Sequence, residues 1–283
     1  MGSCASAWKG DPLDPVEPMR KRTLLLTLPI CTLTMGVLSP PCSSIGSTTQ
    51  ASAPDLLQQA RDADAAIHNK ESLRLLLQAE SLDSTNTEIL CLIAKEYSQL
   101  AADARDAGKC VEEKRLDDLA LGYAVRAVDG DPSSALAHAS LAICYARSSL
   151  LEWTKKKIEY SKLVHSEAER AVEIDPKQDV ALHVLGAWNY NMVELNPFLK
   201  KTVEMIYGKF PEASLQASAD YFQRAAAAAP MRLMHEAALA RTYAAMGDRE
   251  KAHQALALAE ELPIKEKDDA FLLKQAREAV AKM

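Results

Sequence analysis

The sequence predicts an all-α protein, a right-handed α-solenoid of about five helical hairpins with enlarged middle repeats and a C-terminal capping helix. Its composition favours helices: 48% of the 283 residues are hydrophobic and only 10 are Gly, and no stretch alternates like a half-buried strand. The chain also repeats a helix-closing motif, as stacked hairpins do.

The closing motifs share a small residue placed a fixed distance before the residue that ends the helix. They are AESLDS at 79–84, AVDGDP at 127–132, AVEIDP at 171–176 and AAAAAP at 225–230. Their first alanines and their terminators fall where tetratricopeptide repeats have the second-helix alanine and the proline. Residues 55–283 are therefore predicted to form a tetratricopeptide-like helical repeat domain, in which no hairpin is stable without its neighbours.

The middle repeats are longer than a regular repeat. The spans from the first-helix aromatic position to the second-helix alanine, Tyr97–Ala127, Tyr145–Ala171 and Asn189–Ala225, all exceed the usual spacing. Extra helical turns are the simplest way to accommodate such lengths. After Pro263, a final apolar pattern predicts the helix that covers the open end of the stack. Its apolar residues are Phe271, Leu272, Ala276 and Val280.

The fourth repeat contains an insert between Asn196 and Pro211. It separates two predicted helices, at about 180–193 and 214–229. We expect the apolar side of the insert to dock onto the first helix of its own hairpin, because a short helix has little stability in isolation. That side consists of Phe198, Val203, Ile206 and Tyr207.

A second motif in the fourth repeat points to a family. The pattern H-x-L-G-x-W-x-Y is followed by E-L, a basic insert, P-x-A-S and YFxRA, and the tail contains Leu262-Pro263 and then Lys267-Asp268-Asp269. In these features residues 55–283 resemble the regulator of microtubule dynamics family. The matching residues of the fourth repeat are His183, Leu185, Gly186, Trp188, Tyr190, Glu194, Leu195, Pro211, Ala213, Ser214, Tyr221, Phe222, Arg224 and Ala225.

The resemblance implies a non-catalytic adaptor associated with microtubules or with organelle membranes. It implies a protein or peptide partner, which would be tubulin in the microtubule if the protein is cytosolic. It implies no cofactor. The alternative is an exported or membrane-anchored bacterial-type repeat protein with no microtubule role. In that case only the fold and the adaptor character of the family would apply to this chain. An enzyme is the remote alternative.

Residues 1–54 are predicted to be a targeting or anchor segment, disordered or removed. The stretch 19–50 has a basic start, an apolar run and a small polar end, like a signal peptide. Its apolar run is shorter than the roughly 20 residues of a membrane helix and contains Pro29. Export, with translation from Met19 or a long leading region, is the first interpretation, and an N-terminal membrane anchor is the second.

Two other interpretations of the N-terminus stay open. Gly2 and Ser6 match the myristoylation pattern, and Cys4 offers a palmitoylation site. This acylated form would be cytoplasmic and microtubule-associated, or bound to an organelle membrane. An organellar transit peptide is the other, although the acidic residues Asp11 and Asp14 are unfavourable for it.

No pattern in the sequence predicts catalysis, a cofactor or a metal site. The six histidines and six cysteines lack the spacings of zinc sites, and there is no glycine-rich phosphate loop or nucleophile elbow. His183 lies among apolar residues and is expected to be a hydrogen-bonded packing residue. The net charge of −6 argues against general binding of nucleic acid, which depends on neutralising phosphates.

Two clusters of lysines form the candidate docking site, here called the basic patch. Adjacent repeats are expected to bring the clusters onto one side of an otherwise acidic molecule, where tubulin tails or anionic lipids would be suitable partners. A solvated surface with no partner is the competing interpretation. The patch consists of Lys155, Lys156, Lys157 and Lys162 in the third repeat and Lys200, Lys201 and Lys209 in the insert.

Overall fold

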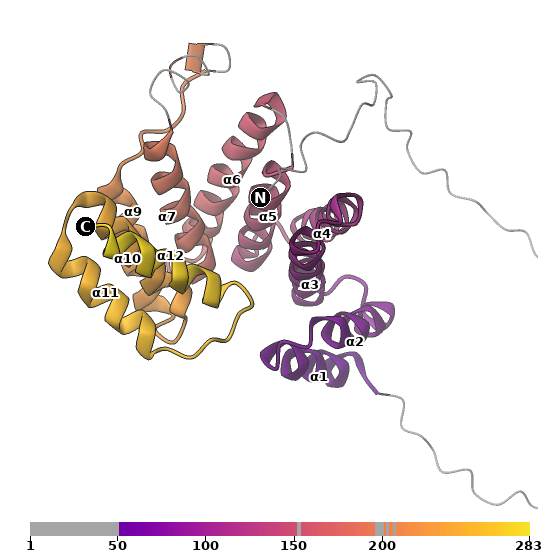
Figure 1. The fold of residues 1–283 in the computed structure, drawn as a ribbon. Coiled ribbons are helices and arrows are strands. Elements are labelled where there is room, and N and C mark those ends of the chain that lie inside the picture. Colours follow the sequence, from indigo (N-terminus) through magenta and orange to yellow (C-terminus); the bar gives the residue numbers. More distant parts are fainter. Residues whose placement is uncertain (1–50, 152–153, 196–200, 202–203, 206–207) are drawn as a thin grey trace, which may run out of the picture. The chain divides into compact units, whose positions relative to one another are not determined.

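The computed structural model describes residues 51–283, except 152–153, 196–200, 202–203 and 206–207, and the described part is built of helices (Figure 1). The predictions for the N-terminal targeting segment therefore fall outside the described residues up to position 50, as do Lys200 and the four apolar insert residues. The helices are α1 (Ala53–Ala65), α2 (Asn69–Leu82), α3 (Thr87–Asp106), α4 (Cys110–Gly130), α5 (Ala135–Ser149), α6 (Thr154–Ile174), α7 (Asp179–Glu194), α9 (Leu215–Ala228), α10 (Leu233–Met246), α11 (Arg249–Glu261) and α12 (Asp269–Ala281).

Successive helices pair into hairpins, which confirms the predicted helical solenoid. The pairs are α1 with α2, α3 with α4, α5 with α6, α7 with α9, and α10 with α11. The first helices also contact one another in the order α3, α5, α7, α10, and we call this row the first-helix layer. The middle repeats are enlarged by longer helices, since α3, α4 and α6 have 20, 21 and 21 residues whereas α1 and α11 each have 13.

The alanines of the closing motifs lie at the tightest points of the stack. Ala79, Ala127, Ala171 and Ala225 are all 0% exposed. A residue larger than alanine at these positions would force the helices of neighbouring hairpins apart, and overpacking of this kind costs stability. The period of small residues seen in the sequence is therefore the period of close helix contacts.

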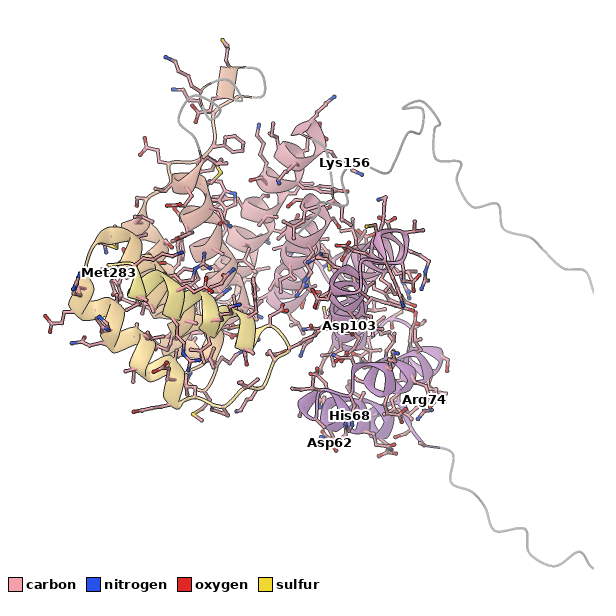
Figure 2. The ribbon with its side chains drawn as sticks, in the orientation of Figure 1. Asp62, His68, Arg74, Asp103, Lys156 and Met283 are labelled. Atoms are coloured by element: carbon pink, nitrogen blue, oxygen red, sulfur yellow. The ribbon has the colours of Figure 1, made fainter. Side chains whose placement is uncertain are left out.

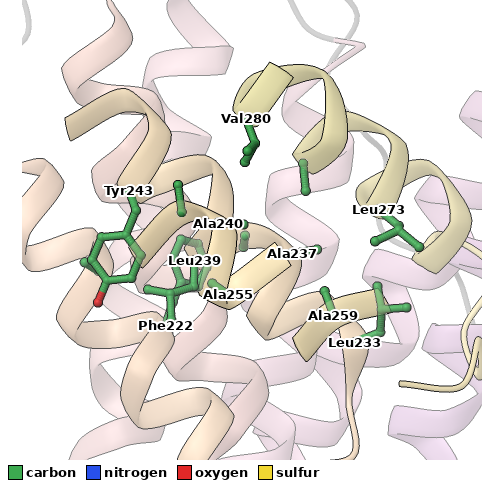
Figure 3. Close-up of a cluster of buried hydrophobic side chains, with 14 residues drawn as sticks. Phe222, Leu233, Ala237, Leu239, Ala240, Tyr243, Ala255, Ala259, Leu273 and Val280 are labelled. Carbon is green, nitrogen blue, oxygen red and sulfur yellow. The ribbon is translucent and has the colours of Figure 1, made fainter. Parts of the chain in front are cut away.

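The last helix covers the end of the stack, as predicted. Figure 3 shows Leu273 and Val280 of α12 beside the cluster built on α10, which includes Leu233, Ala237 and Ala240. The prediction was wrong for Phe271, which is 61% exposed. The buried stripe of α12 includes Leu273, Ala276 and Val280, and Phe271 lies on another side of the helix, exposed to solvent.

Candidate functional site

The first half of the basic patch lies at the start of α6. Lys155, Lys156 and Lys157 are exposed, while Lys162 is partly buried two turns further along the helix. Figure 2 labels Lys156, whose ammonium lies 5.2 Å from the centroid of the Tyr160 ring. Lys162 turns toward the insert, where its Nζ lies 5.7 Å from the centroid of the Phe210 ring.

The second half of the basic patch lies in the insert. Lys201 and Lys209 are exposed, and Met205 between them is 80% exposed. α6 and the insert approach each other at Lys162, whose Nζ lies beside the Phe210 ring and 4.0 Å from the place that a Cβ added at Gly208 would occupy. The described lysines of the patch come from these two elements.

The end of the insert is fixed by a small core that the sequence did not reveal. Phe210 and Ala213 pack against Val164 of α6 and against Trp188 and Met192 of α7. The indole N–H of Trp188 donates to the backbone carbonyl of Ser161 at 3.1 Å, which holds α6 and α7 together at this point. The only signal for Phe210 in the sequence was an aromatic residue directly before a proline.

The family-motif residues have structural contacts. Gly186 lets the Phe222 ring approach α7 so closely that an added Cβ would lie 2.8 Å from two of its ring carbons. His183 lies beside the same ring, with 5.0 Å between the centroids. Leu185 and Ala225 are buried. The rings of Tyr190 and Tyr221 lie under the guanidinium groups of Arg241 and Arg224. Pro211 is exposed at the end of the insert.

A chain of polar residues, of which His235 is fully buried, links α7 to α10. His183 Nδ1 lies 3.2 Å from Nδ1 of His235, whose Nε2 lies 3.1 Å from Asp179 Oδ2. Arg232 donates to the same carboxylate oxygen at 2.7 Å. The Nδ1 atoms of the two imidazoles face each other, so one of them donates its N–H and the other accepts it. His183 is thus a hydrogen-bonded packing residue, as expected. His235 and Asp179 lie 52 and 4 positions from His183 in the sequence, and no sequence pattern pointed to either of them.

Burial and the neighbouring charged groups together set the protonation states of His183 and Asp179. Burial lowers the pKa of His183 well below its usual value, and the neighbouring His235 and Arg232 lower it further. Burial acts to raise the pKa of Asp179, but the hydrogen bond from His235 and the charge of Arg232 outweigh it and bring the pKa to about 2. The folded state therefore holds a neutral His183 and an ionised Asp179.

Acidification from about pH 7 to about pH 5 is expected to lower the free energy of unfolding through His183. The unfolded chain binds a proton at His183 below about pH 6.5, whereas the folded chain does not, so stability falls as the pH drops through this range. Urea unfolding of the His183→Gln variant should show a flatter pH dependence. His253→Gln, at an exposed position of α11, is the control and should keep the wild-type slope. An unchanged slope in His183→Gln would contradict the expectation.

The segment that joins α11 to α12 contacts helices far away in the sequence. Glu266 lies 3.1 Å from Lys95 of α3 and 3.4 Å from Arg232, and Asp268 lies 2.9 Å from Arg147 of α5. Lys267 forms an ion pair with Asp103 of α3, which is labelled in Figure 2. The carboxylate of Asp269 accepts the backbone N–H groups of Lys265 and Glu266 at 2.9 and 2.8 Å. The motif Lys267-Asp268-Asp269 thus has a structural explanation.

A second buried acidic site lies between α3 and α4. Arg105 pairs with Glu113 and lies 3.9 Å from Asp117, and both carboxylates are 2% exposed. Both oxygens of Asp117 lack a hydrogen-bond partner. Burial raises the pKa of Asp117 to about 6, although the charges of Arg105 and Arg147 act in the opposite direction.

Within the described residues, no helix is both long enough and apolar enough to cross a membrane. No group of three metal-binding side chains gathers anywhere in the same part of the chain.

Comparison with known proteins identifies the family. Residues 56–283 match the family model described as regulator of microtubule dynamics protein 1-3. The chain belongs to this family. It is 30% identical over 185 residues to regulator of microtubule dynamics protein 1 of Bos taurus, a match that covers 60% of this chain and 58% of the relative. The protein of the same name from Pongo abelii is 28% identical over 175 residues, covering 62% and 54%.

The chain spans about half the length of the curated relatives it matches. Among solved structures, a thermophilic TPR protein of Thermus thermophilus aligns with a TM-score of 0.57 and 16% identity, covering 81% of this chain and 100% of that one. At this identity the similarity shows the fold alone. The family and the repeat fold together support a helical adaptor or scaffold, a class that is typically non-catalytic.

Proposed function

We propose that this protein is a non-catalytic adaptor that docks through its basic patch on a negatively charged partner, the surface of a microtubule. The observation that supports this most directly is the contact between α6 and the insert, since Lys162 of α6 reaches Phe210 at the end of the insert. We expect the exposed lysines of these two elements to act on one partner. A concentration of positive charge on a molecule with a net charge of −6 gives it a preferred face for an anionic partner.

An anionic membrane surface is the second candidate partner, favoured by the apolar residues near the lysines. Met205 is 80% exposed between Lys201 and Lys209, and Leu150 is 60% exposed shortly before Lys155. Apolar side chains surrounded by lysines are suited to the boundary between lipid headgroups and acyl chains. The family name favours the microtubule, and the experiment below separates the two partners.

Replacing Lys155, Lys157, Lys201 and Lys209 together with glutamate is expected to weaken microtubule binding at least about 100-fold, because each attractive charge becomes a repulsive one. The measurement is co-sedimentation of the full chain with microtubules and, in parallel, with vesicles that contain phosphatidylserine. Binding by the unaltered protein should weaken as salt rises, because exposed charges are screened over about 8 Å at physiological ionic strength.

The matched control carries the same change of charge elsewhere. Lys70, Lys109, Lys177 and Lys282 are exposed and lie outside the basic patch. Their replacement by glutamate should leave most of the binding intact, and neither variant should unfold, since exposed substitutions usually change stability by no more than about 0.5 kcal/mol each. Equal losses in both variants, or unchanged binding in the patch variant, would contradict a docking role for the patch. Loss of vesicle binding alone would identify the membrane as its partner.

A further inference from the structure

The segment 262–268 meets the first-helix layer with a defined order of charges. Glu266 faces the cations Lys95 and Arg232, Lys267 faces Asp103, and Asp268 faces Arg147. The surface formed by α3, α5 and the start of α10 therefore presents a positive, a negative and a positive group in turn. The segment opposes them with an acidic residue, a lysine and an acidic residue.

These contacts are exceptional in a stack of repeats. In a solenoid each repeat contacts its neighbours only, so residues in contact are close in the sequence. Here the paired residues are 171 positions apart for Lys95 and Glu266 and 121 positions apart for Arg147 and Asp268. The segment thus lies across a surface that belongs to other repeats, instead of extending its own.

Leu262 packs against the core cluster of α10, and the rest of the segment is held mainly by polar contacts. Ile264 is 54% exposed, so it adds little apolar burial. The side chains of Glu266 and Asp268 are 26% and 44% exposed, and ion pairs with this access to water each contribute only about 0–1 kcal/mol. The geometry is specific while the attachment is weak.

The cations have supports that do not depend on the segment. Lys95 also pairs with Asp64 at 2.8 Å, and Arg232 pairs with Asp179 at 2.7 Å. These partners keep both side chains in place when Glu266 is absent. They also offset part of the positive charge, so a plain polyanion is a poorer ligand for this surface than a peptide that alternates acid, lysine and acid.

We propose that Lys95, Arg232, Asp103 and Arg147 form a peptide-binding surface for an extended partner segment that carries the order acid, lysine, acid, and that Glu266, Lys267 and Asp268 occupy it in the unbound chain. This inference rests on the adaptor function proposed above, but it uses none of the lysines of the basic patch. The tethered segment competes at an effective concentration on the order of millimolar, so it weakens the apparent affinity for a free peptide.

The test uses a fluorescent peptide that copies residues 262–270, LPIKEKDDA, and the full-length chain. In the first variant, Glu266→Lys, Lys267→Glu and Asp268→Lys together repel the segment from the surface. A milder variant, Glu266→Gln with Asp268→Asn, serves if the first fails to fold by circular dichroism. Fluorescence anisotropy should show peptide binding at least about tenfold tighter than to the unaltered chain.

Four controls make the outcome decisive. A peptide of the same composition with its charges reordered should bind no tighter to the variant than to the unaltered chain. Arg147→Gln with Asp103→Asn, added to the variant, should remove the gain, whereas the glutamate substitutions in the basic patch should leave it. Glu212→Gln with Glu261→Gln, two exposed positions elsewhere, should produce no gain.

Hydrogen exchange gives an independent readout on the unaltered protein. Excess peptide should accelerate exchange of the backbone amides of Lys265 and Glu266, which donate to Asp269 in the occupied state. An unchanged affinity in the variant, equal binding of the reordered peptide, or unchanged exchange would each overturn the proposal. The basic-patch experiment can fail while this one succeeds, so the two proposals are separable.

Discussion

Replacing Gly186 with valine is expected to lower the free energy of unfolding by about 3 kcal/mol, because there is no room for a side chain at this position. A Cβ on Gly186 would lie 2.8 Å from Cδ1 and Cε1 of Phe222. The ring cannot easily move away, since Phe222 is 2% exposed and His183 lies beside it. Urea denaturation followed by circular dichroism measures the change.

Gly122 offers a matched control for adding a methyl group to a helical glycine, with alanine at both positions. It lies within α4, and an added Cβ there would meet nothing within 4 Å. Gly122→Ala should stabilise the protein by about 0.5–1 kcal/mol, through helix propensity alone. Gly186→Ala should instead destabilise it, and Phe222→Leu should cost less in that background than in the unaltered chain. If Gly186→Ala stabilises the protein as Gly122→Ala does, the contact with Phe222 is not the constraint inferred here.

Replacing Asp117 with asparagine is expected to stabilise the protein at neutral pH by about 3 kcal/mol, which is the free energy equivalent of raising a carboxyl pKa from its usual value to about 6. The carboxylate is buried with both oxygens unpartnered, so its charged form opposes folding. The folded pKa lies above the unfolded one, so the native protein gains stability as the pH falls through about 6. The advantage of the variant should therefore vanish near pH 4.

Asp118 is the control because it is the next residue of the same helix. Its side chain is 60% exposed and pairs with Lys114. Asp118→Asn should change the free energy of unfolding by no more than about 0.5 kcal/mol at either pH. A destabilised Asp117→Asn variant at neutral pH would mean that the ionised carboxylate supports the fold through Arg105.

The fold was predictable because its determinants recur at short range. The alanines that begin each closing motif are small where helices touch, and burial of Ala79 and Ala171 at 0% exposure follows from the same repeated spacing. The apolar residues of α7 followed from helical periodicity in the same way. Leu182, Leu185, Trp188 and Met192 are all buried.

The polar contacts were not predictable because no periodicity governs them. His235 and Glu266 lie in different repeats from His183 and Lys95, and any charged residue on the right face would look the same in the sequence. Phe271 was misassigned because the prediction grouped Phe271 and Leu272 with Ala276 and Val280, whereas the buried face of α12 contains Leu273. The lysines of the basic patch were readable in the sequence, but the contact of Lys162 with Phe210, which brings α6 to the insert, was not.

The contacts of residues 266–268 also affect the order in which the protein can be completed. A chain is made from its N-terminus, and its early hairpins can fold from local contacts as they leave the ribosome. Lys95 and Arg147 must wait for Glu266 and Asp268, which are synthesised 171 and 121 positions later. During translation both cations therefore lack these acidic partners until the segment has been made.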